Sequence, residues 1–230
     1  MLEKGENDMD RATFIARLDQ IKAVVSKLDA KIYSWEIGEP ASVEIVCAIE
    51  KKYKIQLPTD FVEMITKVAG KVNIIWSVHE NKSFRKQHPQ FRELSSGVLR
   101  WDIEHYLSEK EYQGYLYYTS HWEDMRGLLD FAEVPNGDMI LFNLANAGEK
   151  KPVVYLNHDG LYSYPVQLAE CFGDYVESLL QIGLVGNEIW QLEKFIQPEP
   201  EEKNGKPCIA GAIDPECNYA LAWRKLIGLL

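Results

Sequence analysis

The sequence lacks the features that mark membrane proteins and disulfide-rich secreted proteins. No apolar run reaches the roughly 20 residues that a membrane-spanning helix needs, and residues 1–8 contain no apolar signal core. The four cysteines form no C-x-x-C pair, and the spacing of Cys208 and Cys217 in the tail does not establish a bridge. We therefore expect a soluble, reduced, cytoplasmic protein that does not act at a membrane.

Motifs for nucleotide binding and covalent catalysis are also missing. The chain contains no G-x-x-x-x-G-K-S/T loop, no G-x-G-x-x-G turn and no G-x-S-x-G elbow. The neighbouring carboxylates Glu123 and Asp124 point apart on any helix or strand, so they are not poised as an acid–base pair. We expect no catalytic residues, no cofactor and no metal, and hence a chain that is not an enzyme.

The charge balance bears on the partner. Lys and Arg number 25 against 35 Asp and Glu, which gives a net charge of −10. This balance argues against nucleic acid as the partner, because nucleic-acid binding needs clustered Lys and Arg. It suits a basic protein partner, although acidity also simply aids solubility. The small basic patch of Lys82, Arg85 and Lys86, flanked by His79 and His88, is interpreted as a solvated loop.

Apolar periodicity predicts three helices before the first strand. Residues 10–32 carry apolar side chains at alternating spacings of four and three, from Phe14 to Ile32. Ser42 is placed to cap a second helix that ends at Tyr53. A third helix follows Pro58 and is expected to end at Gly70 in a left-handed conformation.

Strands are predicted where β-branched and aromatic residues concentrate. The region 81–92 is interpreted as a loop, Asp102 as the cap of a short helix through residue 112, and 113–131 as ambiguous. Asp159-Gly160 favours a type I′ turn between two strands, and a helix with an apolar stripe covers residues 172–180. The predicted strands are 72–78, 97–101, 139–144, 153–157 and 161–164.

The segregation of strands and helices predicts an α+β fold with a central antiparallel sheet and helices packed against it. We divide the chain into an N-terminal helix that packs on the core (1–41), a main domain (42–196), and a linker with a C-terminal helix (197–230). The last helix is expected to start at Asp214-Pro215-Glu216. The oligomeric state is left open.

Three segments carry a family resemblance: residues 49–61 (IEKKYKIQLPTDF), Gly137-Asp138 with residues 152–160 (PVVYLNHDG), and residues 168–172 (LAECF) running on to Leu179-Leu180. From residue 42 to about residue 195, the chain resembles the SMI1/KNR4 family of the SUKH superfamily. The resemblance implies the same α+β fold. It also implies a bacterial immunity protein that binds and neutralises a cognate toxin, since the long disordered arms of the fungal relatives are missing.

The preferred hypothesis is therefore a non-enzymatic protein-binding module whose partner is a basic toxin domain. Four acidic residues are the candidate partner-binding residues, because turns and loops should place them outward: Asp138, Asp159, Glu123 and Asp124. The alternatives are a regulatory or assembly adaptor, like the fungal cell-wall-synthesis regulators, and an enzyme with an unrecognised site.

Two groups of residues allow more than one interpretation. His158-Asp159 with Asp138 has the residue types of a metal or acid–base cluster, but a third ligand is lacking and a hairpin turn is favoured. Asp138 is equally suited to begin a strand and accept backbone N–H bonds from its loop. Tryptophans are enriched at interface hot spots, yet at least half of Trp76, Trp101, Trp122 and Trp190 are expected to fill the core.

Overall fold

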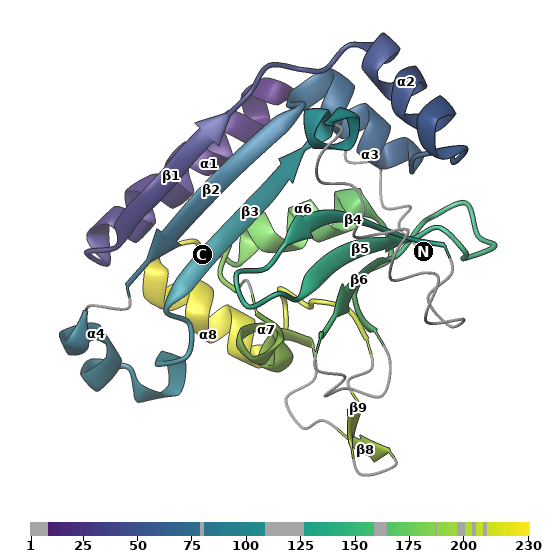
Figure 1. Ribbon diagram of the computed structural model, residues 1–230. Helices are drawn as coiled ribbons and strands as arrows, with labels where there is room; N and C mark the ends of the chain where they lie inside the picture. Colours follow the sequence, from purple (N-terminus) through teal and green to yellow (C-terminus); the bar gives the residue numbers. More distant parts are fainter. Residues whose placement is uncertain are drawn as a thin grey trace, which may run out of the picture.

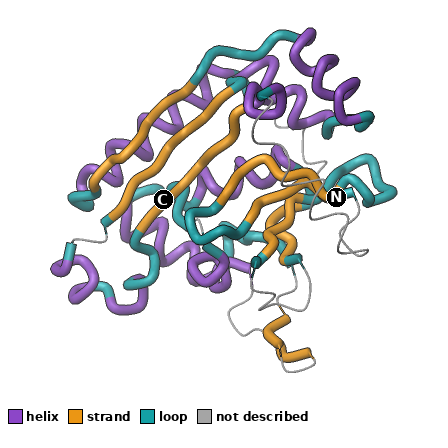
Figure 2. Tube along the Cα trace, viewed as in Figure 1, coloured by secondary structure: helices purple, strands orange, loops and turns teal. Residues whose placement is uncertain are grey.

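The structure is a computed structural model and describes residues 9–78, 81–108, 127–158, 165–186, 188–196, 201–203, 206–208 and 211–230. The described strands form antiparallel sheets of three and four strands and a short two-stranded hairpin. Figure 1 shows the two larger sheets side by side, and Figure 2 shows the helices gathered around them. The predicted α+β class with antiparallel pairing is confirmed, with two sheets where one was expected.

The three-stranded sheet has the order β1–β2–β3. Every second residue of β2 and β3 is buried, which is the period that a sheet with one covered side requires. Helix α1 lies behind this sheet in Figure 1, and its buried stripe includes Phe14 and Leu18. The bounds are α1 (Arg11–Lys27), β1 (Lys31–Ile37), β2 (Lys71–Ser77) and β3 (Ser96–Asp102).

The first helix is shorter than the sequence predicted. It starts after Asp10, whose carboxylate accepts the Thr13 N–H at 2.7 Å, and ends at Lys27. Asp29 then takes a positive φ of 57° and the chain turns into β1, which pairs along β2. Ile32 fits the helical spacing, but its strand pairing opposite Trp76 decides its structure. The prediction of a helix over residues 28–32 is therefore wrong.

The second and third helices form where expected. Helix α2 (Val43–Tyr53) follows Ser42, and α3 (Thr59–Glu63) continues into a π-helical turn, η1 (Met64–Val68). The expected left-handed Gly70 is wrong, because Gly70 is not among the residues of positive φ. Its small size matters for another reason: a Cβ there would lie 3.0 Å from the Ala41 Cβ and 3.2 Å from a backbone carbonyl oxygen.

The region expected to be a loop, 81–92, contains helix α4 (Lys82–Gln87) and a 3-10 turn, η2 (Pro89–Phe91). Phe84 and Phe91 are buried against Trp223, with ring centroids 6.3 and 5.5 Å apart. The loop interpretation is corrected, because these two aromatic side chains anchor the segment. Asp102 caps η3 (Ile103–Leu107) as expected, since its carboxylate accepts the Glu104 N–H. The predicted extension through residue 112 is wrong, because the helix ends at Leu107 and Ser108 is extended.

The four-stranded sheet has the order β4–β5–β6–β7, and β3 of the first sheet contacts β4 of the second. Helix α6 (Phe172–Gln181) packs on β7 and α3. The predicted turn at Asp159-Gly160 and the strand at 161–164 lie outside the described residues. The strand bounds are β4 (Leu128–Glu133), β5 (Met139–Asn143), β6 (Val153–Leu156) and β7 (Val166–Ala169).

An aromatic cluster joins α3 and α6 to the four-stranded sheet. The Phe61 ring from α3 lies 4.9 Å from Phe142 of β5 and 4.8 Å from Phe172 of α6, measured between centroids. Phe131 of β4 stacks on Phe142 at 4.5 Å. Tilted and edge-on pairs of this kind add to the free energy of burial. The cluster therefore ties α3, α6 and the four-stranded sheet into one core.

Two helices of the C-terminal segment, α7 (Ile189–Ile196) and α8 (Asn218–Ile227), pack on the rest of the chain. The segment also comprises the hairpin β8 (Glu201–Lys203) with β9 (Lys206–Cys208). The predicted helix start at Asp214 is wrong, because the helix cap is Cys217. Trp223 is 0% exposed, and its indole N–H donates to the Ile182 carbonyl at 2.9 Å.

The core thus takes residues from all three predicted divisions, while their boundaries at 41/42 and 196/197 stay predictions. Phe14, Phe61 and Trp223 belong to one buried cluster. Among the described residues, no helix has the length and apolarity to cross a bilayer.

Candidate functional site

Asp138, the first of the predicted partner-binding residues, is buried rather than exposed. It directly precedes β5 and is 1% exposed. Its Oδ2 accepts the Tyr155 hydroxyl at 2.5 Å and the Asn136 amide at 2.8 Å. Its Oδ1 accepts the His158 backbone N–H at 2.9 Å and lies 2.6 Å from Nδ1 of the same ring. The Asn157 amide lies 3.2 Å from Oδ1.

These contacts define the electrostatic state of Asp138. Burial by itself raises the pKa of the carboxyl, but the hydrogen bonds from Tyr155, His158 and Asn136 outweigh burial and hold the pKa below its ordinary value. The short distance to Nδ1 places a proton on that ring nitrogen, because two acceptors would repel each other at this separation. Burial and the same carboxylate raise the pKa of Tyr155.

The expectation that Asp138 points outward is therefore wrong. The alternative is confirmed for the position, since Asp138 stands at the start of a strand, but the backbone N–H that it accepts is that of His158 beyond β6 and not one from its own loop. Its five donors join the beginning of β5 to the end of β6. The other three candidates, Asp159, Glu123 and Asp124, lie outside the described residues and stay predictions.

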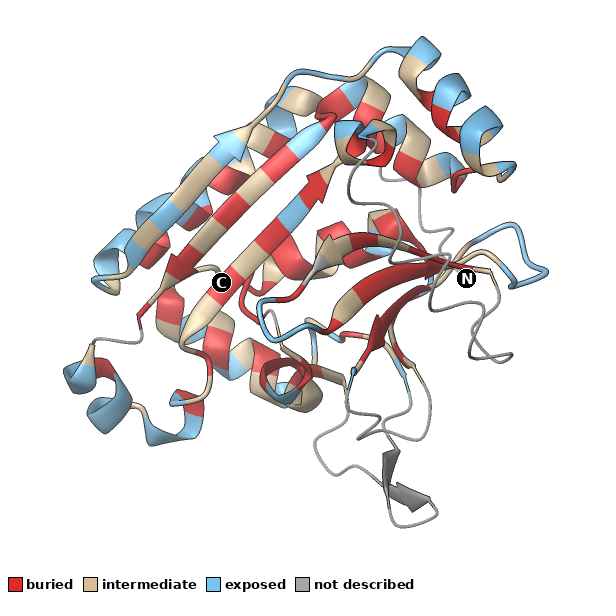
Figure 3. Cartoon of the chain, in the orientation of Figure 1, coloured by how far each residue is buried: buried red, intermediate tan, exposed pale blue. Residues whose placement is uncertain are grey.

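A second candidate site is the side of the three-stranded sheet that faces away from α1, which we call the open face. In Figure 3 its strands alternate buried and less buried residues, and no helix of the described chain lies in front of β1, β2 and β3. Ile75 and Val98 pair across β2 and β3 near its centre, and both are partly buried. Polar neighbours surround them: Ser34, Glu36, Lys71, Asn73, Arg100 and Asp102.

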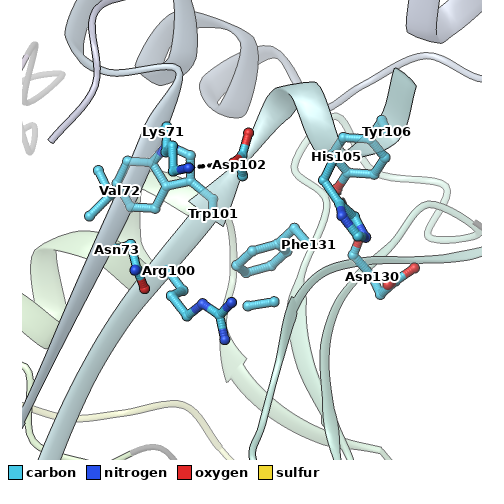
Figure 4. A pocket seen from close by; sticks show the side chains of 11 residues that line it. Lys71, Val72, Asn73, Arg100, Trp101, Asp102, His105, Tyr106, Asp130 and Phe131 are labelled. Carbon is cyan, nitrogen blue, oxygen red and sulfur yellow. Dashed lines mark hydrogen bonds and ion pairs between the residues drawn. The ribbon is translucent and has the colours of Figure 1, made fainter. Parts of the chain in front are cut away.

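Where the open face meets β4, a cavity of about 170 Å³ lies between the two sheets, and we call it the inter-sheet pocket. Figure 4 shows Arg100 reaching from β3 towards β4, with His105 and Asp130 on the opposite wall. Phe131 lies between these two walls. Asn73 also lines the pocket, directly opposite Arg100 in the register of β2 and β3.

The charges of this pocket are partly matched. Lys71 pairs with Asp102 at 3.1 Å, and this contact raises the pKa of Lys71. The Tyr106 hydroxyl donates to the Asp130 carbonyl at 2.7 Å, and burial raises the pKa of this tyrosine well above its usual value. The Arg100 guanidinium forms no hydrogen bond or ion pair with the described residues. Such an arrangement suits recognition of a charged group.

A larger cavity of about 420 Å³ lies between α3, η1 and the start of α6. Its walls carry Asp60, Glu63, Asp174 and Glu177. Their oxygens are already engaged: Asp60 accepts the Gly173 N–H at 2.8 Å, and the other three pair with lysine or arginine. The acidic side chains of this cavity are therefore already paired within the protein. The described part of the chain contains no group of three or more His, Cys, Asp or Glu residues that could hold a metal ion.

The tryptophans divide as the sequence suggested. Trp76 and Trp101 are 0% and 2% exposed and fill the core, whereas Trp190 is 42% exposed. The Trp190 indole N–H donates to Glu188 at 2.7 Å. Trp122 lies outside the described residues, so a role of Trp122 or Trp190 as an interface anchor stays a prediction.

Arg100 and Asn73 were not candidate site residues from the sequence. The alternation in residues 96–102 does place Val98, Arg100 and Asp102 together on one side of a strand. The sequence does not show that β4 lies beside β3, and the pocket forms only because residues of both strands line it.

The sequence was compared with known proteins. No curated protein matches it at a significant level. Residues 40–178, more than half of the chain, match the SMI1 / KNR4 family (SUKH-1). That stretch contains β2, β3, β4, β5 and β6, and with them Asp138 and the inter-sheet pocket. The chain therefore belongs to the SMI1/KNR4 family.

Proposed function

We propose that this protein is an immunity protein that neutralises a cognate bacterial toxin by binding it directly. Family membership supports a protein-binding module. The observation that carries the proposal is the open face, where the apolar pair Ile75 and Val98 is surrounded by polar and charged side chains. Protein interfaces have this arrangement, with an apolar centre and a polar rim.

The charge of the chain fits this role. A net charge of −10 attracts a basic toxin domain and speeds association at low ionic strength. A standard interface buries roughly 1,600 Å² in total, which is enough to cover an active site. Neutralisation would then be steric, and the protein would need no catalytic group of its own. Asp159, Glu123 and Asp124 remain candidate contributors to this acidic surface.

Co-expression tests the proposal. A toxin gene directly beside the gene of this chain is expressed alone, with this chain, and with an unrelated immunity protein as the control. We expect survival and a co-purifying complex only with this chain. Equal killing in all three cultures, with no complex, would refute the proposed function.

The adaptor alternative predicts a different result. An adaptor for an endogenous pathway would have no toxin gene beside it and would give no protection in this assay. Its deletion would instead change growth or cell-wall synthesis in cells that carry no toxin.

A further inference from the structure

The inter-sheet pocket contains polar groups that have no hydrogen-bond or ion-pair partner among the described residues. The Arg100 side chain is exposed, and its guanidinium has no hydrogen-bond or ion-pair partner among the described residues. The Arg85 side chain of α4 is also exposed and without such a partner. Arg100, however, lines the inter-sheet pocket and stands on β3, the strand of the open face that lies next to β4.

Asn73 supplies a second unmatched group in the same pocket. Its amide nitrogen donates to the Ser34 hydroxyl at 3.0 Å, whereas its Oδ1 is buried and accepts no hydrogen bond. Asn73 and Arg100 are direct neighbours across β2 and β3. The pocket therefore combines an exposed, unpaired guanidinium with a buried amide oxygen that has no hydrogen-bond partner.

The size of the pocket limits its occupant. Sites for cofactors and other small molecules usually measure about 300–1,000 Å³, and this cavity measures about 170 Å³. It accommodates one side chain of a bound protein. Phe131 and Ala132 provide an apolar wall against which a methylene group packs.

The charges favour a carboxylate as the group that enters. Asp102 is neutralised by Lys71 at 3.1 Å, and Asp130 lies on the wall opposite Arg100 in Figure 4 and has interactions of its own. A guanidinium binds a carboxylate through two parallel hydrogen bonds, which gives both strength and geometric specificity.

We propose that the inter-sheet pocket binds an Asp or Glu side chain of the partner protein, with Arg100 as its anchor. This inference rests on the proposed function, because it names a contact within that interface. The net charge of −10 repels acidic partners in general. One carboxylate on an otherwise basic partner face would therefore fix how the partner is aligned on the interface and which partner binds. It would not contribute to attraction at long range.

The affinity of the co-purified toxin domain for variants of this chain tests the proposal. We expect Arg100→Ala to weaken binding by about 30-fold or more, as loss of a hot-spot arginine does. Arg100→Lys should restore part of the loss, because lysine keeps the charge but not the two-pronged geometry. The control Arg85→Ala removes the same charge from the surface and should change affinity by less than about twofold.

Two further results separate a binding role from a structural one. All three variants should unfold at the temperature of the wild type. In addition, one acidic-to-lysine change on the toxin domain should restore binding to Arg100→Glu. Unchanged affinity of Arg100→Ala for a toxin that the wild type neutralises would overturn the inference and leave the proposed function intact.

A toxin-independent measurement keeps the inference testable if the proposed function fails. The wild-type protein and Arg100→Ala are titrated with N-acetyl-aspartate methylamide and with its asparagine analogue while side-chain NMR signals are followed. We expect the aspartate compound alone to shift the Arg100 Nε–H signal and the Asn73 amide signal of the wild type. Equal shifts with both compounds, or none, would overturn the inference.

Discussion

Replacement of Asp138 tests whether this carboxylate holds the four-stranded sheet together. The carboxylate is 1% exposed and accepts hydrogen bonds from Tyr155, His158, Asn136 and Asn157. Each hydrogen bond to a charged group contributes about 1.5–3 kcal/mol, but bonds that share one carboxylate are not additive. We expect Asp138→Ala to lower the free energy of unfolding by about 3 kcal/mol.

Asp138→Asn isolates the charge from the shape of the side chain. The amide keeps one acceptor oxygen and presents an NH₂ group to a donor such as the Tyr155 hydroxyl. We expect a loss of about 2 kcal/mol. Asp19→Asn is the matched control, because Asp19 is exposed on α1 and the change in charge is the same. The control should stay within about 0.5 kcal/mol of the wild type.

The pH dependence has a definite sign. The pKa of Asp138 is lowered in the folded protein, so the unfolded chain binds its proton more readily. The stability contributed by the ionised carboxylate is then fully present above the unfolded pKa of about 3.9 and is lost as the pH falls through the lower, folded pKa. The difference between the wild type and Asp138→Asn should therefore shrink in acid.

Urea unfolding at several pH values measures these differences, with an unchanged slope as the check that both states expose the same surface. If Asp138→Asn is as stable as Asp19→Asn at neutral pH, the carboxylate does not join β5 to β6. A difference that grows as the pH falls would refute the sign of the linkage.

Three further predictions concern packing and thiol reactivity. Gly97→Ala should lower the free energy of unfolding by about 3 kcal/mol in urea titrations, because the added Cβ would lie 2.3 Å from Nε1 of Trp76. An unchanged free energy of unfolding would contradict the packing of β3 on Trp76. Trp223→Ala should cost about 4 kcal/mol in the same assay, since the indole is 0% exposed, and a smaller loss than 1 kcal/mol would show that α8 does not dock as described. Burial raises the pKa of Cys171 to about 12, whereas Cys47 is exposed. Mass spectrometry after alkylation at pH 8 should find Cys47 modified and Cys171 protected until the protein unfolds, and equal labelling would refute this.

Much of the fold could be predicted because several segments have strong local signals. The β-branched and aromatic residues of 72–78 and 153–157 form strands within two residues of the predicted bounds. Ser42 and Asp102 occupy their predicted cap positions. The strand β1 was missed because Ile32 continues a helical spacing, and only its pairing with β2 overrides that spacing.

The candidate sites depended more on long-range contacts. The position of Asp138 before a strand could be predicted, but its burial comes from Tyr155 on the neighbouring strand and from His158 beyond it. Cys47 is exposed and Cys171 is buried, although both lie in segments with apolar residues at helical spacing. The pocket at Arg100 needs β4 beside β3, and no local pattern specifies that neighbour.

The central claim is that the protein acts by binding a partner through the open face. The most direct test is the affinity of the toxin domain for Val98→Glu, with Val43→Glu as control. Val98 lies on the open face, paired with Ile75, whereas Val43 is 63% exposed on α2. Both variants should fold with the circular dichroism spectrum of the wild type. The account predicts that Val98→Glu loses binding while Val43→Glu binds like the wild type. Equal, undiminished binding by both variants would contradict it.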